Sequence, residues 1–162
     1  MDTLSHALWS KGVFGYRGSG KLAVFYGVFP DISFVTLFCI KIISGTLDYS
    51  GGPTLENLKQ LEPIPSWVLH MDNYTNSFVI SFAVIGITYF IKSELVWPMF
   101  AWPFHIVLDF AFHTKDLFPI QLFWPISSFF IDGISWSHPQ IWYPNFAGIL
   151  ILFLWRYKII FK

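Results

Sequence analysis

Three ionisable side chains recur at four-residue intervals inside one of the most apolar stretches of the chain, Leu95–Pro119. They are His105, Asp109 and His113. If the stretch is helical, they share one stripe, and His105 and Asp109 lie about 6 Å apart along the axis, close enough to share a metal ion. His113 is about 12 Å from His105 along the helix. It would therefore bind a second ion, contact a ligand of the first ion, or interact with the helix end. The alternative is three buried polar groups that satisfy one another, but ionisable groups at membrane depth are costly, and this favours a functional site.

The composition is typical of an integral membrane protein. Of the 162 residues, 54% are hydrophobic, 21% are aromatic and 12% are charged, and this charge is about half that of a soluble domain. The net charge of zero leaves no basic footprint for nucleic acid. Cys39 is the only cysteine, which excludes an internal disulfide and a cysteine-based zinc site. The length suits a single membrane-embedded domain over residues 1–162.

Apolar segments predict an all-α bundle of about four membrane-spanning helices. The expected spans are Leu22–Ile43, Tyr74–Ile91, Leu95–Phe112 and Ile141–Ile160. With this topology, seven lysines and arginines lie on the side of the two termini and two lie on the other side. The positive-inside rule therefore predicts a multi-pass protein with both termini in the cytoplasm.

The same topology places Asp31 and His105 at a similar depth near the middle of the bilayer, with Asp109 and His113 toward the outer side. Two aspartates that face only neutral histidines repel each other, and a divalent cation removes this repulsion. His6 belongs to a short polar segment that is expected to form an N-terminal helix. This helix must reach up from the cytoplasmic side, or re-enter the fold, for His6 to join the other residues.

Short motifs follow one another in a recognisable order: SHAL around His6, Gly27-x-x-Pro30-Asp31, Thr75-Asn76-Ser77, His105-x-x-x-Asp109, and then His113 and Phe118-Pro119. In this order they resemble the bacterial inner-membrane predicted metal-dependent hydrolases, one branch of which is described as LexA-regulated. That family is in turn similar to the zinc-dependent phospholipases C, which are helical enzymes with a metal cluster. The resemblance implies that His6, Asp31, His105 and Asp109 are metal ligands, that His113 is a further candidate, and that the divalent metal is zinc. In such a hydrolase, Asp31 or Asp109 could bridge ions or act as the catalytic group that takes the proton of a bound water.

One position departs from that family, because Asn76 stands where the family has a histidine. An asparagine oxygen is a weak neutral ligand where imidazole binds zinc strongly. Either the protein binds a harder ion, or His70 substitutes, or the site has lost an ion and its catalysis. Asn76 and Ser77 also fit the first turn of the second expected span, where they could act as helix caps. His70, Asp132 and His138 lie in loops and are weaker site candidates.

The sequence therefore predicts a metal-dependent hydrolase of the cell inner membrane that acts on a lipid phosphoester, with membrane lipid and not nucleic acid as its partner. The substrate follows from the resemblance alone. The alternative is a non-catalytic membrane protein: a pseudoenzyme that binds a regulatory partner, or an ion or proton pathway, because intramembrane Asp and His chains also serve as proton relays. Bound metal distinguishes the hydrolase from a structural scaffold.

Overall fold

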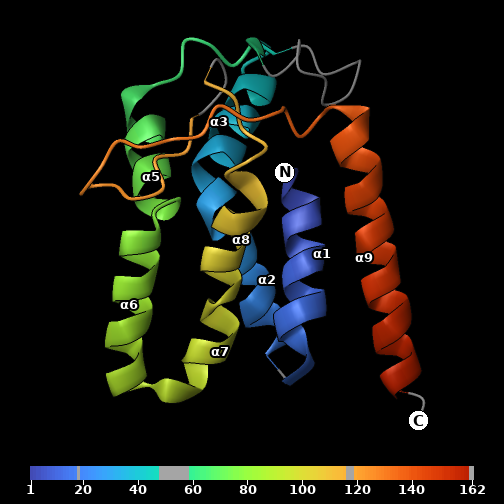
Figure 1. Ribbon diagram of the computed structural model, residues 1–162. Coiled ribbons are helices and arrows are strands. Elements are labelled where there is room, and N and C mark those ends of the chain that lie inside the picture. The colour runs from blue at the N-terminus through green and yellow to red at the C-terminus, as the bar shows by residue number, and fades with distance from the viewer. Residues whose placement is uncertain (18, 48–58, 116–118, 161–162) are drawn as a thin grey trace.

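The computed structural model of the protein describes residues 1–17, 19–47, 59–115 and 119–160. The helical elements in chain order are α1 (Thr3–Phe14), η1 (Gly15–Arg17), α2 (Gly20–Val28), η2 (Phe29–Asp31), α3 (Ile32–Ile43), α5 (Ser66–Thr75), α6 (Phe78–Ile91), η3 (Ser93–Leu95), α7 (Val96–Met99), α8 (Ala101–Asp109) and α9 (Pro139–Ile160). Within these ranges every element longer than a single bridge residue is helical, which confirms the all-α expectation. The long helices run side by side as one bundle (Figure 1).

α1 lies inside this bundle, packed against α2 and α8 on one side and α9 on the other (Figure 1). Asp2 caps its start, because the Asp2 carboxylate accepts a hydrogen bond from the backbone N–H of Ser5 at 2.9 Å. Small residues allow α1 and α2 to approach closely, since any side chain at Gly27 would overlap that of Ser10. The N-terminal helix therefore re-enters the fold, as His6 requires.

The segment from α2 to α3 matches the first expected span. Gly20–Ile43 is a 24-residue helical stretch that is long and apolar enough to cross a membrane. Pro30 has no backbone N–H, and the chain tightens here into the short 3₁₀ turn η2. Asp31 is therefore held at the joint between two helices.

α5 and α6 form a helix pair that is bent by 56°. Ser77 caps α6, because its Oγ accepts hydrogen bonds from the N–H groups of Val79 (3.1 Å) and Ile80 (3.3 Å). Ser77 therefore acts as the expected cap. Asn76 does not, because its side chain turns back to Asp72 on α5.

The four expected spans are not all established. Within the described ranges, the α2–α3 segment is the one helix that is long and apolar enough to cross a membrane, and the bent α5–α6 pair adds a second if it is counted as one span. α9 has 22 residues at the place of the fourth expected span, but it carries Pro144 inside the helix. A bundle with four spans stays a prediction.

The third expected span, Leu95–Phe112, is divided into η3, α7 and α8, and α8 ends at Asp109. The reason is tertiary: the carbonyls of residues 111–113 accept hydrogen bonds of 2.9–3.1 Å from the N–H groups of residues 133–136. These bonds draw the chain away from the helix. The continuous helix on which a single stripe depended therefore ends at Asp109, and His113 follows after the turn of residues 110–112.

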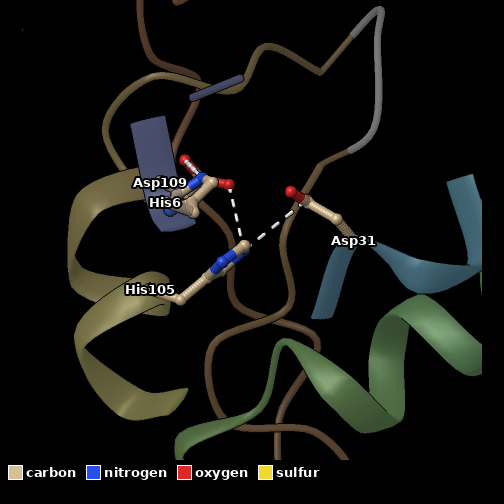
Figure 2. Close-up of side chains that lie close together, drawn as sticks. All are labelled: His6, Asp31, His105 and Asp109. Carbon is tan, nitrogen blue, oxygen red and sulfur yellow. Dashed lines mark ion pairs between the residues drawn. The ribbon is translucent and has the colours of Figure 1, made fainter. Parts of the chain in front are cut away.

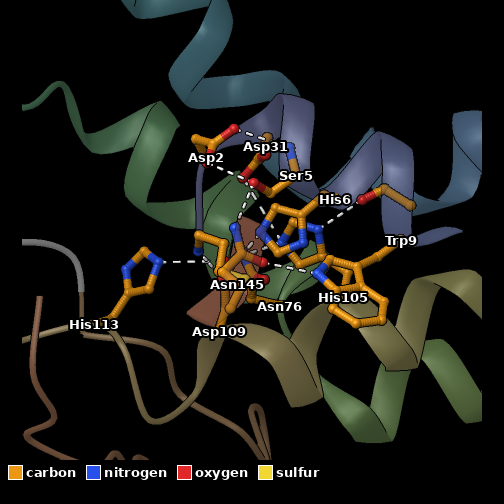
Figure 3. Close-up of polar contacts among 12 residues, drawn as sticks. Asp2, Ser5, His6, Trp9, Asp31, Asn76, His105, Asp109, His113 and Asn145 are labelled. Atoms are coloured by element: carbon orange, nitrogen blue, oxygen red, sulfur yellow. Dashed lines mark hydrogen bonds and ion pairs between the residues drawn. The ribbon is translucent and has the colours of Figure 1, made fainter. Parts of the chain in front are cut away.

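α9 forms the edge of the bundle and is fixed to α1 by buried polar contacts. Asn145 donates from Nδ2 to Ser5 Oγ at 2.8 Å and accepts at Oδ1 from the indole N–H of Trp9 at 2.8 Å. Ser5 Oγ in turn donates to the Asp2 carboxylate at 2.7 Å (Figure 3). This chain of bonds links α9 to the start of α1.

Candidate metal centre

Four side chains converge inside the bundle (Figure 2). His6 comes from α1, Asp31 from η2, and His105 and Asp109 from α8. One ligand atom of each residue lies within 4.8 Å of the corresponding atoms of the other three. The α8 pair is held in place because the residues beside it on that helix are buried in an apolar cluster. The fold thus brings together the four residues that the sequence predicts as ligands.

The distances within this cluster suit one small cation. His6 Nε2 lies 3.0 Å from Asp109 Oδ1, and His105 Nε2 lies 3.3 Å from Asp109 Oδ2 and 3.7 Å from Asp31 Oδ1. Ligand atoms about 2.1 Å from one tetrahedral ion are about 3.4 Å from each other. Two imidazole nitrogens and two carboxylate oxygens at this spacing form a set that Zn²⁺ accepts.

The ring orientation of His105 is fixed by a hydrogen bond on the side away from the cluster. Its Nδ1 lies 2.7 Å from the carbonyl oxygen of Gly27, and because a carbonyl only accepts, Nδ1 carries the proton. In the neutral imidazole, Nε2 then presents a lone pair toward the oxygens of Asp31 and Asp109, which are also acceptors. His105 Nε2 is buried and has no hydrogen-bond partner among the described residues. With a neutral His105, a cation between the three groups would satisfy this lone pair and both carboxylates, and backing of this kind is typical of metal-binding histidines.

His6 is also poised as a neutral ligand. Its side chain is completely buried, and this burial lowers the pKa of His6 to about 4, against the attraction of the Asp109 carboxylate, which raises it. The His6 and His105 rings stack with centroids 3.6 Å apart and planes 24° apart. Neither ring nitrogen of His6 has a hydrogen-bond partner in the described part of the chain. The stack brings the Nε2 atoms of both rings to the Asp109 carboxylate.

A cavity of about 270 Å³ opens beside the cluster. Asp31 and His113 line it, and Asp31 is the more accessible carboxylate, with its side chain 17% exposed against 2% for Asp109. Asp31 Oδ2 makes no hydrogen bond to any described residue. The remaining wall is mostly apolar and includes Phe34, Val35, Phe38, Leu61 and Trp136. The site therefore offers a polar end next to an apolar chamber.

His113 lies at the edge of the tight cluster rather than within it. Its Nε2 is 3.2 Å from Asp109 Oδ2 (Figure 3). Asp109 therefore contacts three histidines at once, together with the amino group of Met1. His113 has the position of a group that supports the shared carboxylate and faces the cavity.

Sequence reasoning missed Asp72, which is 5% exposed. Its Oδ1 accepts from Asn76 Nδ2 at 2.8 Å, and it lies near enough to Asp31 and His113 to interact electrostatically with both. The signal was an aspartate four residues before Asn76, on one helical face. Asn76 Oδ1 is buried without a partner among the described residues.

Two carboxylates lie at the centre of the cluster. Asp31 and Asp109 converge with the two histidines, and the amino group of Met1 contacts Asp109. Two carboxylates close together repel each other when both are ionised, and a divalent cation between them removes this repulsion. The donor set thus fits a divalent metal ion.

The weaker candidates lie outside the cluster. His70 is exposed, and its Nδ1 lies 2.7 Å from the carbonyl of Ser66 on its own helix. His70 therefore does not substitute at the Asn76 position. Asp132 pairs with Lys115 at 3.7 Å on the surface, and His138 lies exposed just before α9. Neither residue belongs to the metal cluster.

Comparison with known proteins finds no matching protein family, no similar curated protein and no similar solved structure. The family resemblance of the motifs stays a prediction.

Proposed function

We propose that this chain is a divalent-metal-dependent hydrolase of the cell inner membrane, with zinc as its metal and a lipid phosphoester as its substrate. The observation that carries the proposal is the orientation of His105, whose Nε2 lone pair points at two carboxylates because Gly27 holds the opposite ring nitrogen. A divalent cation at this point would contact the Nε2 lone pair and both carboxylates at once.

His6, Asp31, His105 and Asp109 would hold the metal. When bound, the metal supplies Lewis-acid polarisation of a phosphoryl oxygen and a water that ionises near neutral pH. Asp31 lines the cavity, and its carboxylate would take the proton of the attacking water. The water oxygen forms a new bond to phosphorus, the ester P–O bond breaks, and the leaving alcohol is protonated from solvent. Asp109 is too buried for this role and acts as a ligand that also positions His113.

The apolar chamber supports a lipid as the substrate. Phe34, Val35 and Phe38 are on α3, which continues the apolar segment that is long enough to cross a membrane. A phosphoester placed at Asp31 would have its hydrocarbon part against these side chains, inside the bilayer. In the proposed arrangement the chain passes the membrane four times with its C-terminal end in the cytoplasm, and α1 re-enters the bundle so that Met1 lies against Asp109 rather than in the cytoplasm as expected from the charge pattern.

Metal content tests the centre. Protein purified in detergent from zinc-replete cells should carry zinc, and His105→Ala should lose most of it, while His70→Ala, an exposed histidine outside the cluster, should retain it. Hydrolysis is then followed as release of a phosphorylated headgroup from phospholipid in mixed micelles. Asp31→Asn should abolish this release, because it removes both a ligand and the proton acceptor.

Two outcomes would contradict the proposal. Wild-type protein that contains no metal would refute the metal centre, and so would equal metal content in the His105→Ala and His70→Ala variants. The cluster would then be a polar network that joins helices. Metal-loaded protein that releases no headgroup from any phospholipid class would retain the centre and refute the lipid hydrolase.

A further inference from the structure

The end of the bundle away from the metal cluster is strongly basic. The last turn of α1, the start of α2, the α6–η3 turn and the last turns of α9 all lie at this end (Figure 1). The described cations on these segments are Lys11, Lys21, Lys92, Arg156 and Lys158, and Glu94 of η3 is acidic. Among the described residues, none of these five cations forms an ion pair with a carboxylate. This end therefore carries a net positive charge.

Two adjoining cavities are hollowed into this end. One, of about 240 Å³, lies between α1, α2 and α9 and is lined by Lys11, Tyr16, Phe153 and Arg156. The other, of about 590 Å³, is lined by Lys11, Lys21 and Leu22. Lys11 and Gly20 belong to both linings, so the two spaces are neighbours. The positive charge is thus arranged around a concave space rather than spread over a flat surface.

Arg156 is held in place without any ligand. Its Nη2 donates to the carbonyl of Val13 at 2.9 Å, and its guanidinium lies 4.0 Å from the centre of the Tyr16 ring. The Trp155 ring is 5.6 Å away. Nε is buried and has no hydrogen-bond partner among the described residues. A fixed guanidinium loses little entropy when it binds, and its planar fork matches phosphate oxygens.

The helices that line the cavities expose apolar side chains on their outer surfaces. Next to the cations, α9 exposes Ile151, Leu154 and Trp155, and α2 exposes Phe25. A ligand seated at Arg156 and Lys11 would therefore have an anionic group in the cavity and a hydrocarbon part along these helices. An inorganic anion uses only the first of these features.

We propose that these two cavities bind the headgroup of an anionic phospholipid, with its phosphate between Arg156, Lys11 and Lys21 and its acyl chains along α2 and α9. This site is separate from the metal centre, and its lipid is a bound ligand rather than a substrate. Because α1 carries both Lys11 and His6, the lipid stabilises the helix that completes the metal centre.

Native mass spectrometry of the full chain in detergent tests this site. The probes are phosphatidylglycerol, phosphatidylcholine with the same acyl chains, and inorganic phosphate. Wild-type protein should bind phosphatidylglycerol at least about tenfold more tightly than phosphatidylcholine. Lys11→Gln and Arg156→Gln should each weaken phosphatidylglycerol binding about fivefold, as expected for one basic residue at an anionic headgroup.

Lys92→Gln is the matched control, because Lys92 lies at the same end but lines neither cavity. It should change binding less than twofold. Lys11→Gln keeps the result interpretable if Arg156→Gln fails to fold, since Lys11 is exposed and unpaired among the described residues. Equal losses in Lys92→Gln and Lys11→Gln would show a diffuse positive surface and overturn the proposal. So would equal binding of the two lipids, or displacement of phosphatidylglycerol by millimolar inorganic phosphate.

Discussion

Replacing Asp109 by asparagine should abolish the stabilisation of the protein by metal. The Asp109 carboxylate is 2% exposed and contacts His6, His105 and His113. The asparagine side chain keeps the shape but loses the charge, and its amide can donate a hydrogen bond to His105 Nε2. The Nε2 lone pair, which the proposed metal would contact in the wild type, is then satisfied by the protein itself. The variant should therefore bind metal poorly and remain folded without it.

The size of the effect follows from linkage. A metal ion present at 100 times its dissociation constant stabilises the folded state by about 2.7 kcal/mol. For a chain of this length, 1 kcal/mol shifts Tm by about 2–4 °C. Wild-type protein should therefore melt about 5–11 °C higher with zinc than after chelation. The Asp109→Asn variant should shift by less than about 2 °C, because most of its metal affinity is lost.

The assay is thermal unfolding in detergent, followed by tryptophan fluorescence, with and without zinc. Asp132→Asn is the matched control, because Asp132 makes only a surface pair with Lys115 and is outside the cluster. It should show the full wild-type shift. If zinc moves the melting temperature of Asp109→Asn as far as that of the wild type, a centre built on Asp109 is refuted.

Four further results are expected. Asn76→His should raise metal affinity or stoichiometry, measured by elemental analysis, because Asn76 Oδ1 is buried and unpartnered among the described residues; unchanged metal content would limit Asn76 to its bond with Asp72. Ser77→Ala should lower the free energy of unfolding by about 1 kcal/mol through loss of the α6 cap, with metal content unchanged; a loss of metal would contradict a purely structural role. Gly27→Ala should weaken metal binding without removing a ligand, since a methyl group there overlaps Ser10 and displaces the carbonyl that orients His105; wild-type affinity would show that this backing is dispensable. Reporter fusions after Glu62 should be read outside the cytoplasm and those after Lys92 inside; a cytoplasmic Glu62 fusion would overturn the orientation.

Part of the site follows from local rules that a sequence displays. The spacing of His105 and Asp109 predicts two groups on one face of a helix, and α8 has them there. His113 has the same four-residue spacing but lies beyond the end of α8. The reason is that the carbonyls of residues 111–113 accept hydrogen bonds from a segment about twenty residues later in the chain. Helical periodicity carries no information about such tertiary bonds.

Other parts depend on packing that the sequence does not reveal locally. The convergence of His6 and Asp31 on α8 requires α1 to enter the bundle, and that depends on the fit of Gly27 against Ser10. The link from Asp72 to the site is of the same kind: its bond to Asn76 is local, but its closeness to Asp31 and His113 comes from the packing of α5 against the rest of the bundle. The all-α class follows from composition and apolar segments, whereas the number of spans does not, since proline-broken helices mark no clear ends.

The position of α1 in the middle of the bundle also sets the order in which the protein can mature. His6 is synthesised well before its partner Asp109, which emerges only after six of the eight α-helices in the described ranges have been made. Until then α1 lacks the groups that contact its buried histidine. If the site binds a metal as proposed, capture would come late in assembly, and a loaded centre would identify a molecule in which α1 and α8 have already packed together.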